Sequence, residues 1–387
     1  MGWDRQPPEE VITPVPPVPV RWVAAAGMAI LACVLLFLLY ASERLPQLQA
    51  LNVWAVSGSP LLIWLLAFAA RAHVYGRALS QQQFLEEEAQ AAQQAWSSWA
   101  QRYLVVHGSC VLLPDQVTAT MLVQGSPSVP PRTGLARRIA YLPAPGGDRL
   151  QAGLQQLFEA LQPTLLALPR EQELRVTLLN DGEPGQHEAL RNAWQHNWSA
   201  SMDRAQPSVV TLTGELSYQW IDQKLKTASP AFELILVLQL CGDAVYSDGL
   251  AALLLSPNGL TGTAELPVVG GLLRPMSLNV SELQNEVAMF LQTQTSARQA
   301  AGLLADSIAC QPLAGKIIAA GSAHGASPSL AQQWIQEPLC GLAGPFSSWL
   351  IAALGVEMVR HQRRPLLVLS QGDPQHWIGT VTMGALA

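Results

Sequence analysis

The feature that most constrains this chain is a pair of long apolar runs near its N-terminus. Residues 22–42, WVAAAGMAILACVLLFLLYAS, carry no charge, and residues 45–70 form a second charge-free run. Because an α-helix rises 1.5 Å per residue, about 20 such residues cross the roughly 30 Å hydrocarbon core of a bilayer. The first run is too long for the apolar part of a signal peptide, and a second run follows it directly. We therefore predict a transmembrane hairpin over residues 21–76, which places the protein in contact with the lipid bilayer.

The basic residues that flank the hairpin predict its orientation. Arg5 and Arg21 precede the first helix and Arg71 and Arg77 follow the second, whereas the connecting loop holds a single arginine beside a glutamate. Lys and Arg favour the cytoplasmic side of a membrane, so we expect a multi-pass protein with both termini in the cytoplasm. Residues 1–20 are rich in proline and are expected to be unstructured.

The composition of the chain excludes several classes of protein. Only 13% of the residues are charged and 49% are hydrophobic, which is unlike a disordered chain. A net charge of −6 without a Lys/Arg block argues against nucleic-acid binding, because phosphate contacts need a basic surface. The sequence contains no GxGxxG, P-loop or GxSxG motif. We therefore expect no bound cofactor. The cysteines form no CxxC pair, so we predict neither a disulfide framework nor a zinc site. They are Cys33, Cys110, Cys241, Cys310 and Cys340.

Beyond the hairpin, the pattern predicts one helix and then an α/β domain. Residues 77–103 are rich in Ala, Gln and Glu and contain no Gly or Pro, so they favour a helix. From residue 104 to residue 387, apolar strand-like runs alternate with helical segments. This alternation predicts a mixed, mainly parallel sheet with helices on its faces. It divides into two halves, residues 104–264 and 265–387.

Five segments of this domain carry specific expectations. QVTATMLVQG (116–125) and GKIIAAG (315–321) are predicted as strands from their Val, Thr and Ile content. The continuous apolar run FELILVLQLCG (232–242) predicts a strand that is covered on both faces. Residues 277–307 and 344–362 are each predicted as one long helix.

Three stretches of the domain resemble thiolase-like, or β-ketoacyl synthase-like, condensing enzymes. Residues 340–383 are similar to the end of those enzymes, where a Gly/Ala-rich loop opens a long helix that a strand follows. Residues 234–259 resemble the segment in which a buried strand precedes an EGAAALVL run. GSAHGAS (321–327) resembles the loop that carries a catalytic histidine. The resemblance covers roughly residues 165–387 and implies a thiolase-like α/β fold.

The same resemblance implies a nucleophile that this sequence does not supply. Condensing enzymes use a cysteine at a helix N-terminus in their first half, where the helix dipole lowers the thiol pKa. This chain has no cysteine between Cys110 and Cys241. Lys316 and His324 are the remaining candidates for catalytic residues, and a solvated loop histidine is the alternative for His324. The resemblance therefore implies the fold without its chemistry.

A membrane anchor joined to such a domain resembles the accessory proteins of bacterial type VI secretion clusters, including the type VI lipase adaptors. This resemblance implies a non-catalytic binding protein of the bacterial inner membrane whose partner is a secretion effector or spike protein. Two alternatives stay open: an acyl-thioester-dependent condensing or acyltransferase-like enzyme, and a structural membrane subunit. The enzyme requires a nucleophile within reach of His324, and the adaptor requires an exposed apolar patch on the domain.

Two loops contain acidic residues, and only the first is a candidate ligand site. NDGEPGQHE (180–188) follows a predicted strand and contains Asp181 and His187. In open α/β sheets, ligands bind at the carboxyl ends of strands, although this spacing is loose for a metal. Asp243 and Asp248 are too loosely placed for an acid/base pair, so a turn is expected there.

Overall fold

The computed structural model describes residues 3, 13–42, 52–125, 133–143, 147–202, 205–207, 209–227, 229–257, 266–327, 332–372 and 375–384. The chain forms two compact units. One comprises Gln6–Ala95, and the other comprises Met1–Arg5 together with Trp96–Ala387. Most of the Pro-rich segment 1–20 lies outside the described residues.

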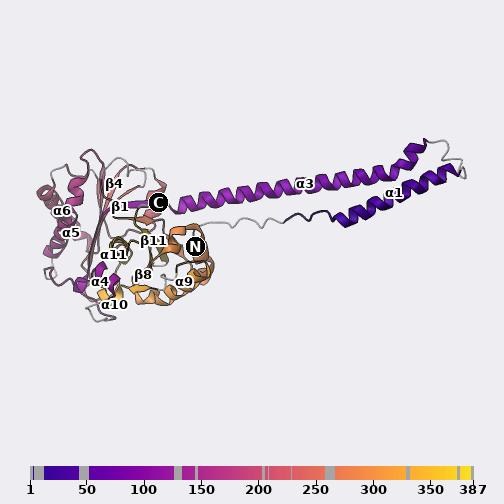
Figure 1. Ribbon diagram of the computed structural model, residues 1–387. Coiled ribbons are helices and arrows are strands. Elements are labelled where there is room, and N and C mark those ends of the chain that lie inside the picture. The colour runs from indigo at the N-terminus through magenta and orange to yellow at the C-terminus, as the bar shows by residue number, and fades with distance from the viewer. Residues whose placement is uncertain are drawn as a thin grey trace. The chain divides into compact units, whose positions relative to one another are not determined.

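The first unit is a helical hairpin. Helices α1 (Pro19–Ala41) and α3 (Val53–Ala100) are both long and apolar enough to cross a membrane, and their apolar windows are almost wholly exposed (Figure 1). They pack through aromatic rings: the Trp64 indole donates a hydrogen bond to the Trp22 carbonyl at 3.2 Å, and Phe68 stacks on Trp64 at 5.5 Å. Because the start of α1 meets residues well inside α3, the two helices run antiparallel.

Helix α3 joins two predicted segments into one. It is 48 residues long and continues from the second apolar run without a break to Ala100, three residues before the predicted end of the helix 77–103, because Tyr103 already belongs to strand β1 (Tyr103–Leu112). Pro60 lies inside it and leaves the Val56 carbonyl without its amide donor. The Ser59 hydroxyl donates to that carbonyl at 2.9 Å, which satisfies it within the apolar segment. The predicted start of the second run, residues 45–51, lies outside the described residues.

The second unit is an α/β domain built on one eleven-stranded mixed sheet. Its strand order is β3-β2-β4-β5-β1-β6-β11-β10-β8-β9, with β7 paired to β11. The prediction of a mainly parallel sheet is wrong, because only four of the ten strand pairings in the described residues are parallel. Neighbours along the chain such as β4 and β5, or β10 and β11, are joined by short loops and are therefore antiparallel. The strands are β1 (Tyr103–Leu112), β2 (Leu174–Asn180), β3 (Val209–Thr213), β4 (Phe232–Gln239), β5 (Gly249–Pro257), β6 (Gly270–Leu273), β7 (Met276–Leu278), β8 (Leu303–Ala305), β9 (Gln333–Ile335), β10 (Leu366–Gln371) and β11 (His376–Thr382).

The sheet repeats one strand order twice. In the first half the order is third, second, fourth, fifth, first, from β3 to β1. The second half has the same order if β6 is counted as its first strand. From the outer edge inward, its third, second, fourth, fifth and first strands are then β9, β8, β10, β11 and β6. In each half, the fifth strand runs antiparallel to its neighbours. The halves meet at their first strands, where Tyr103 of β1 pairs with Leu273 of β6.

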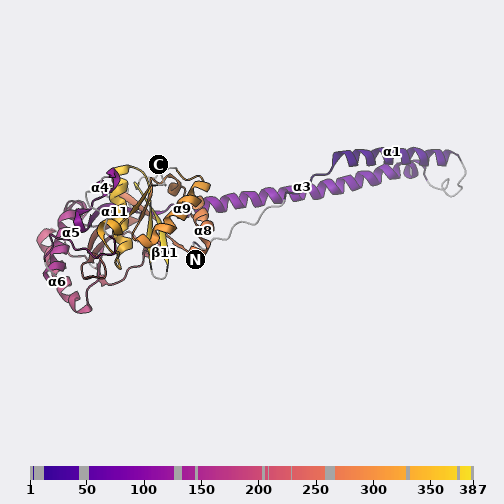
Figure 2. The same cartoon turned by 90° about the horizontal axis from the view of Figure 1, so that it is seen from below.

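Helices cover the sheet in layers (Figures 1 and 2). Helices α5 and α6 pack on one face of the first half, and α8 and α9 pack on the second half. Helix α11 lies between them and contacts strands of both halves, so its side chains are almost all buried. Strand β4 shows both faces covered: Ile235 belongs to the α11 core and Leu236 to the α5/α6 core. The helices of the domain are α4 (Ala119–Gln124), α5 (Gly147–Ala167), α6 (His187–Ser201), α7 (Trp220–Lys226), α8 (Leu283–Thr293), α9 (Gln311–Ala323), α10 (Glu337–Cys340) and α11 (Ser347–Gln362).

The structure confirms two of the five segment predictions, the buried strand at 232–242 and the long helix at 344–362. The strand predicted at 116–125 is wrong, because the Thr118 side chain caps α4 and Gly125 ends it with φ 66°. The single helix predicted at 277–307 is wrong, because that segment holds strands β7 and β8 as well as α8.

The strand predicted at 315–321 is also wrong, because this segment belongs to α9. Its buried residues are Leu313, Ala314, Ile317 and Gly321, a spacing that places them on one face of a helix. Pro312 near the helix start further favours this conformation.

Candidate functional site

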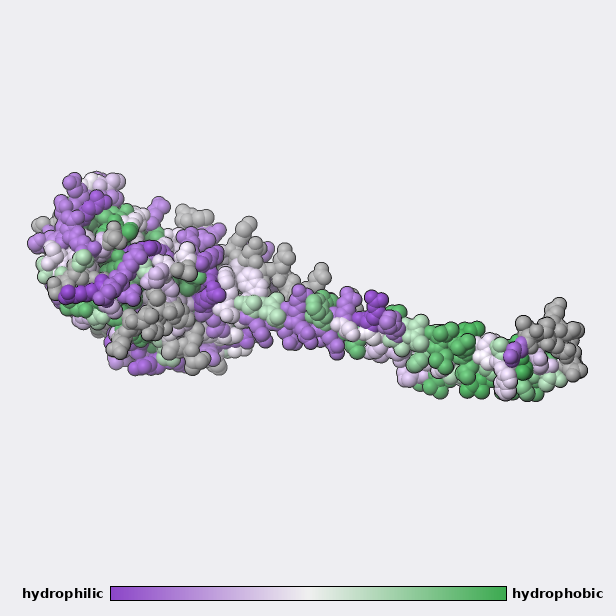
Figure 3. All heavy atoms as spheres, turned by 90° about the horizontal axis from the view of Figure 1, so that it is seen from above, coloured by the Kyte–Doolittle hydropathy of each residue, from purple (hydrophilic) through white to green (hydrophobic). Residues whose placement is uncertain are grey.

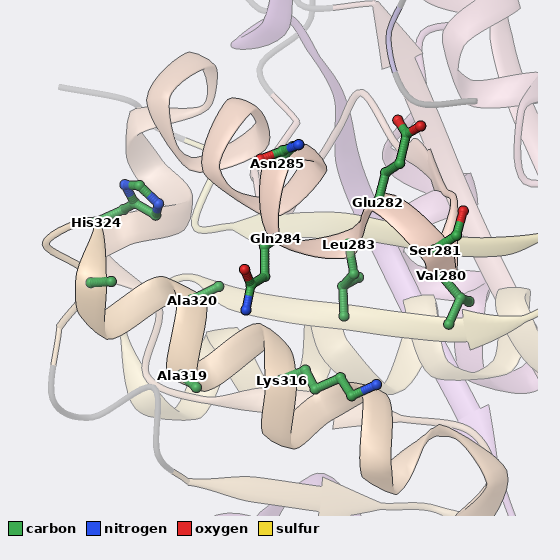
Figure 4. A pocket seen from close by; sticks show the side chains of 11 residues that line it. Val280, Ser281, Glu282, Leu283, Gln284, Asn285, Lys316, Ala319, Ala320 and His324 are labelled. Carbon is green, nitrogen blue, oxygen red and sulfur yellow. The ribbon is translucent and has the colours of Figure 1, made fainter.

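Lys316 and His324 line one surface groove between α8 and α9 (Figure 4). The groove has a volume of about 610 Å³. Lys316 lies on α9 and His324 is its C-cap, so the two are about two helical turns, or ~12 Å, apart along the helix. Figure 4 shows the Lys316 side chain extending away from His324, with Gln284 of α8 between them. Both predicted candidates therefore line the same groove, but their side chains are too far apart to act on the same substrate atom.

None of the described residues that line the groove with His324 is a cysteine. The nearest cysteine in chain order is Cys310, which is the N-cap of the same 13-residue helix. At 1.5 Å per residue, the thiol and the imidazole lie about 20 Å apart. In the part of the chain that the structure describes, the hydrogen bonds of His324 are those of its backbone amide, to Ala320 and Gly321.

Burial raises the pKa of every cysteine outside the two apolar helices. The pKa of Cys110 is raised to about 11, and those of Cys241, Cys310 and Cys340 are raised to about 12. The Asp181 carboxylate adds to the effect at Cys241, and the Asp306 carboxylate adds to it at Cys310. Although Cys310 stands at a helix N-terminus, its thiol is therefore protonated at neutral pH.

The raised pKa can be measured at Cys241, because this residue is exposed enough for a reagent to reach it although its thiol is partly desolvated. We expect iodoacetamide to alkylate Cys241 slowly at pH 8. The fraction of Cys241 present as thiolate at this pH is on the order of 10³-fold smaller than for a thiol of ordinary pKa. The rate should still rise about tenfold per pH unit at pH 9–10, and Asp181→Asn should increase it because a nearby negative charge is lost. Peptide mass spectrometry of the alkylated full-length protein measures this rate. A rate that levels off below pH 9 would contradict it.

The two carboxylates that follow the second strand of each half have the same structural role. Asp181 follows β2 and accepts the backbone N–H groups of Leu240 and Cys241, at 3.1 and 2.9 Å. Asp306 follows β8 and accepts the backbone N–H of Gln371 and the hydroxyl of Ser347, at 3.0 and 2.8 Å. Each carboxylate thus holds the end of the fourth strand of its half. Asp181, a candidate ligand residue in the sequence, is occupied by these backbone bonds.

The N-terminus of α7 is closed by aromatic side chains. Tyr218 is buried just before this helix, and its ring meets Trp349 of α11 at 5.7 Å. Trp220 meets the same indole at 5.8 Å. Trp349 Nε1 donates to the Leu216 carbonyl at 2.8 Å. Helix α7 lies between the third and fourth strands of the first half, and rings fill the space at its start.

The remaining acidic candidates are structural. Asp248 is buried, accepts the backbone N–H of Ile139 at 2.7 Å and forms an ion pair with Arg149. Burial raises the pKa of Asp248. Asp243 is exposed in a turn with φ 46° and pairs with Arg138. Within the described residues, no His, Cys, Asp and Glu side chains gather in a group that could hold a metal ion.

Sequence reasoning missed the residue that holds the end of α3, the fully buried Arg274. Its Nη1 forms an ion pair with Asp222, its Nε donates to the Trp99 carbonyl at 3.3 Å, and its guanidinium stacks on the Trp99 ring at 4.1 Å. The Gln294 amide donates to the Ala100 carbonyl at 3.0 Å. These donors satisfy carbonyls at the C-terminus of the 48-residue helix. The only local signal was an arginine in an otherwise apolar stretch, GGLLRPM.

The surface of the domain is mostly hydrophilic on the face shown in Figure 3. Green areas on that face are small and separate, whereas the two long helices carry a broad apolar surface. The adaptor hypothesis requires a broad apolar patch on the domain, and the coloured, described part of this face shows only these small areas. The exposed large hydrophobic residues of the described part of the domain are Leu135, Tyr141, Leu166, Val209, Val245, Val268, Val280 and Met383.

No protein-family model matches the sequence, and no curated protein matches it. Among solved structures, the chain is similar to the oxazolomycin ketosynthase domain of Streptomyces albus JA3453, with 14% identity and a TM-score of 0.49 over 73% of this chain and 95% of that one. It is similar to a type II polyketide synthase ketosynthase in complex with its acyl-carrier protein, with 11% identity and a TM-score of 0.49 over 73% and 99% of the two chains. It is also similar to OleA of Xanthomonas campestris, with 11% identity and a TM-score of 0.43 over 72% of this chain and 98% of that one. All three TM-scores lie below 0.5 and all three identities below 15%, so these likenesses assign neither a family nor an activity to this chain.

Proposed function

We propose that this protein is a membrane-anchored, non-catalytic binding protein whose thiolase-like α/β domain holds a protein partner at the bilayer. The finer form of the proposal is an adaptor that recruits a type VI secretion effector or spike protein at the bacterial inner membrane. Its support is the sequence resemblance described above together with the two long apolar helices. The groove between α8 and α9 is the proposed contact surface, because it is the place where the candidate residues gather.

One observation carries the non-catalytic part of the proposal. Condensing chemistry on acyl thioesters begins with a thiolate nucleophile. The four cysteines outside the apolar helices have thiol pKa values raised to about 11 or 12. Cys310 and His324 also sit at opposite ends of α9. The thiol and the imidazole at the two ends of α9 are therefore too far apart to act on one atom.

The second candidate is the acyl-thioester-dependent enzyme. The specific observation in its favour is that Lys316 and His324 share a groove lined by both polar and apolar residues. The enzyme and the binding protein differ in one measurable product, a covalent acyl adduct on the protein.

We expect no acyl adduct when the full-length protein in detergent is incubated with octanoyl-CoA and examined by intact-mass spectrometry. Ketosynthases treated in parallel serve as the positive control. An adduct of one acyl group per chain on any cysteine would overturn the non-catalytic assignment.

A capture experiment tests the binding role. The tagged full-length protein is isolated in detergent from its native cells beside Lys316→Glu and, as a matched charge control away from the groove, Arg175→Glu. We expect one secreted protein or spike component to be enriched with the wild type and with Arg175→Glu, and to fall at least fivefold with Lys316→Glu. Absence of any enriched protein from the wild type would contradict the adaptor role.

A further inference from the structure

An aromatic socket at the end of α3 holds the tryptophan near the start of the chain. The Trp3 indole meets the edge of the Trp99 ring at 5.4 Å and lies on Phe290 of α8 at 5.5 Å. Its Nε1 donates a hydrogen bond to the Pro275 carbonyl at 3.1 Å. The half-buried Trp3 side chain thus has two aromatic neighbours and a hydrogen-bond partner for its polar atom, as is usual for a tryptophan taken out of water.

The walls of this socket are fixed by the domain itself. Phe290 is fully buried in the core between α8 and α9. The Trp99 ring is covered on another side by Arg274, and Trp96 meets it edge-on at 5.1 Å. The Gln294 amide bonds the Arg274 carbonyl at 2.7 Å. The walls of the socket are therefore held by contacts that do not involve Trp3, which comes from a distant part of the sequence.

We infer that this socket is an intramolecular binding site for the N-terminal tryptophan, which closes the membrane hairpin into a loop. Trp3 and Trp99 belong to one compact unit, although the whole helical hairpin lies between them in the chain. A contact of this kind requires the N-terminus and the domain to lie on the same side of the bilayer. The inference concerns the anchor and holds whatever partner the domain binds.

Trypsin cleavage after Arg5 in the full-length protein reconstituted into phosphatidylcholine vesicles tests this site. With Trp3 seated, cleavage of the adjacent bond should be slow, and Trp3→Ala should accelerate it at least tenfold. Trp3→Phe should fall between them, because it keeps the ring contact and loses the bond to Pro275. Trp54→Ala, at an indole 78% exposed, is the control and should leave the rate unchanged.

The socket side is tested with Phe290→Leu, which should accelerate the same cleavage, while the double variant with Trp3→Ala should add nothing further. Equal rates for the wild type and Trp3→Ala would overturn the inference. So would vesicles in which external trypsin removes the N-terminus while the domain stays protected inside. Protection that grows with the protein-to-lipid ratio would overturn the intramolecular assignment and indicate exchange of Trp3 between copies.

Discussion

Replacing Arg274 with leucine is expected to lower the free energy of unfolding of the domain by about 3–5 kcal/mol. Arg274 is fully buried and forms an ion pair with Asp222, a carboxylate that is 14% exposed. Without the guanidinium, Asp222 keeps its ion pair with Lys226, and the Trp99 carbonyl keeps one of its two donors, the Arg102 amide at 3.4 Å. A buried carboxylate with fewer partners and a carbonyl that loses a donor both favour the unfolded chain.

Denaturant titration of the full-length protein in detergent, followed by tryptophan fluorescence, measures this effect. Arg274→Lys keeps the charge and loses the planar stacking on Trp99, so its loss should be intermediate. Arg175→Leu removes an exposed pair with Glu173 and should leave the transition midpoint nearly unchanged. Equal midpoints for the wild type and Arg274→Leu would show that the end of α3 is held by other contacts.

The sequence predicts those elements whose signal is long and local. The apolar runs are continuous over about 20 residues, so α1 and the apolar part of α3 could be predicted from length alone. The strand β4 and helix α11 are equally clear, because one is a short continuous apolar run and the other is an apolar stretch of 16 residues, which is longer than a strand.

Short apolar segments are ambiguous for a physical reason. Residues 315–321 satisfy the composition of a strand, and the helix becomes evident only with Leu313 and Ala314, which extend the same buried face. Sheet direction is also hidden, because alternation of strands and helices does not reveal which strands pair. β1 shows this best: its neighbours β5 and β6 are both antiparallel and far along the chain.

In the candidate site, too, some residues could be predicted from the sequence and others could not. Lys316 and His324 are candidates through the resemblance to condensing enzymes, and the structure places both on one groove. Arg274 could not be predicted, because its partners Asp222 and Trp99 lie 52 and 175 positions away in the chain. No local pattern records a contact over such distances, so the residues that fix α3 to the domain emerge only from the fold.

Replacing a glycine with alanine is expected to change the free energy of unfolding in opposite directions at Gly341 and at Gly315. Gly341 ends α10 with φ 86° and ψ −175°, a conformation that L-residues with a side chain rarely adopt. A Cβ there would lie 2.2 Å from the Ser247 hydroxyl and 2.6 Å from the Leu135 carbonyl oxygen. Both neighbours are held in place, since Ser247 Oγ accepts the Arg137 amide and the Leu135 carbonyl accepts the Leu342 amide. Gly341→Ala is therefore expected to lower the free energy of unfolding by about 3 kcal/mol or more, from backbone strain and overlap together.

Gly315 is the matched control within the same domain. It lies inside α9, and a Cβ there would meet nothing within 4 Å. Alanine is more favourable than glycine in a helix interior, so Gly315→Ala should raise the free energy of unfolding by about 0.5–1 kcal/mol. Thermal unfolding of the full-length protein in detergent should then give a lower Tm for Gly341→Ala and a slightly higher Tm for Gly315→Ala. If Gly341→Ala melts with the wild type, the loop that leads from α10 to α11 has room to rearrange. The tight approach of Gly341 to Ser247 and Leu135 would then not be what positions the start of α11.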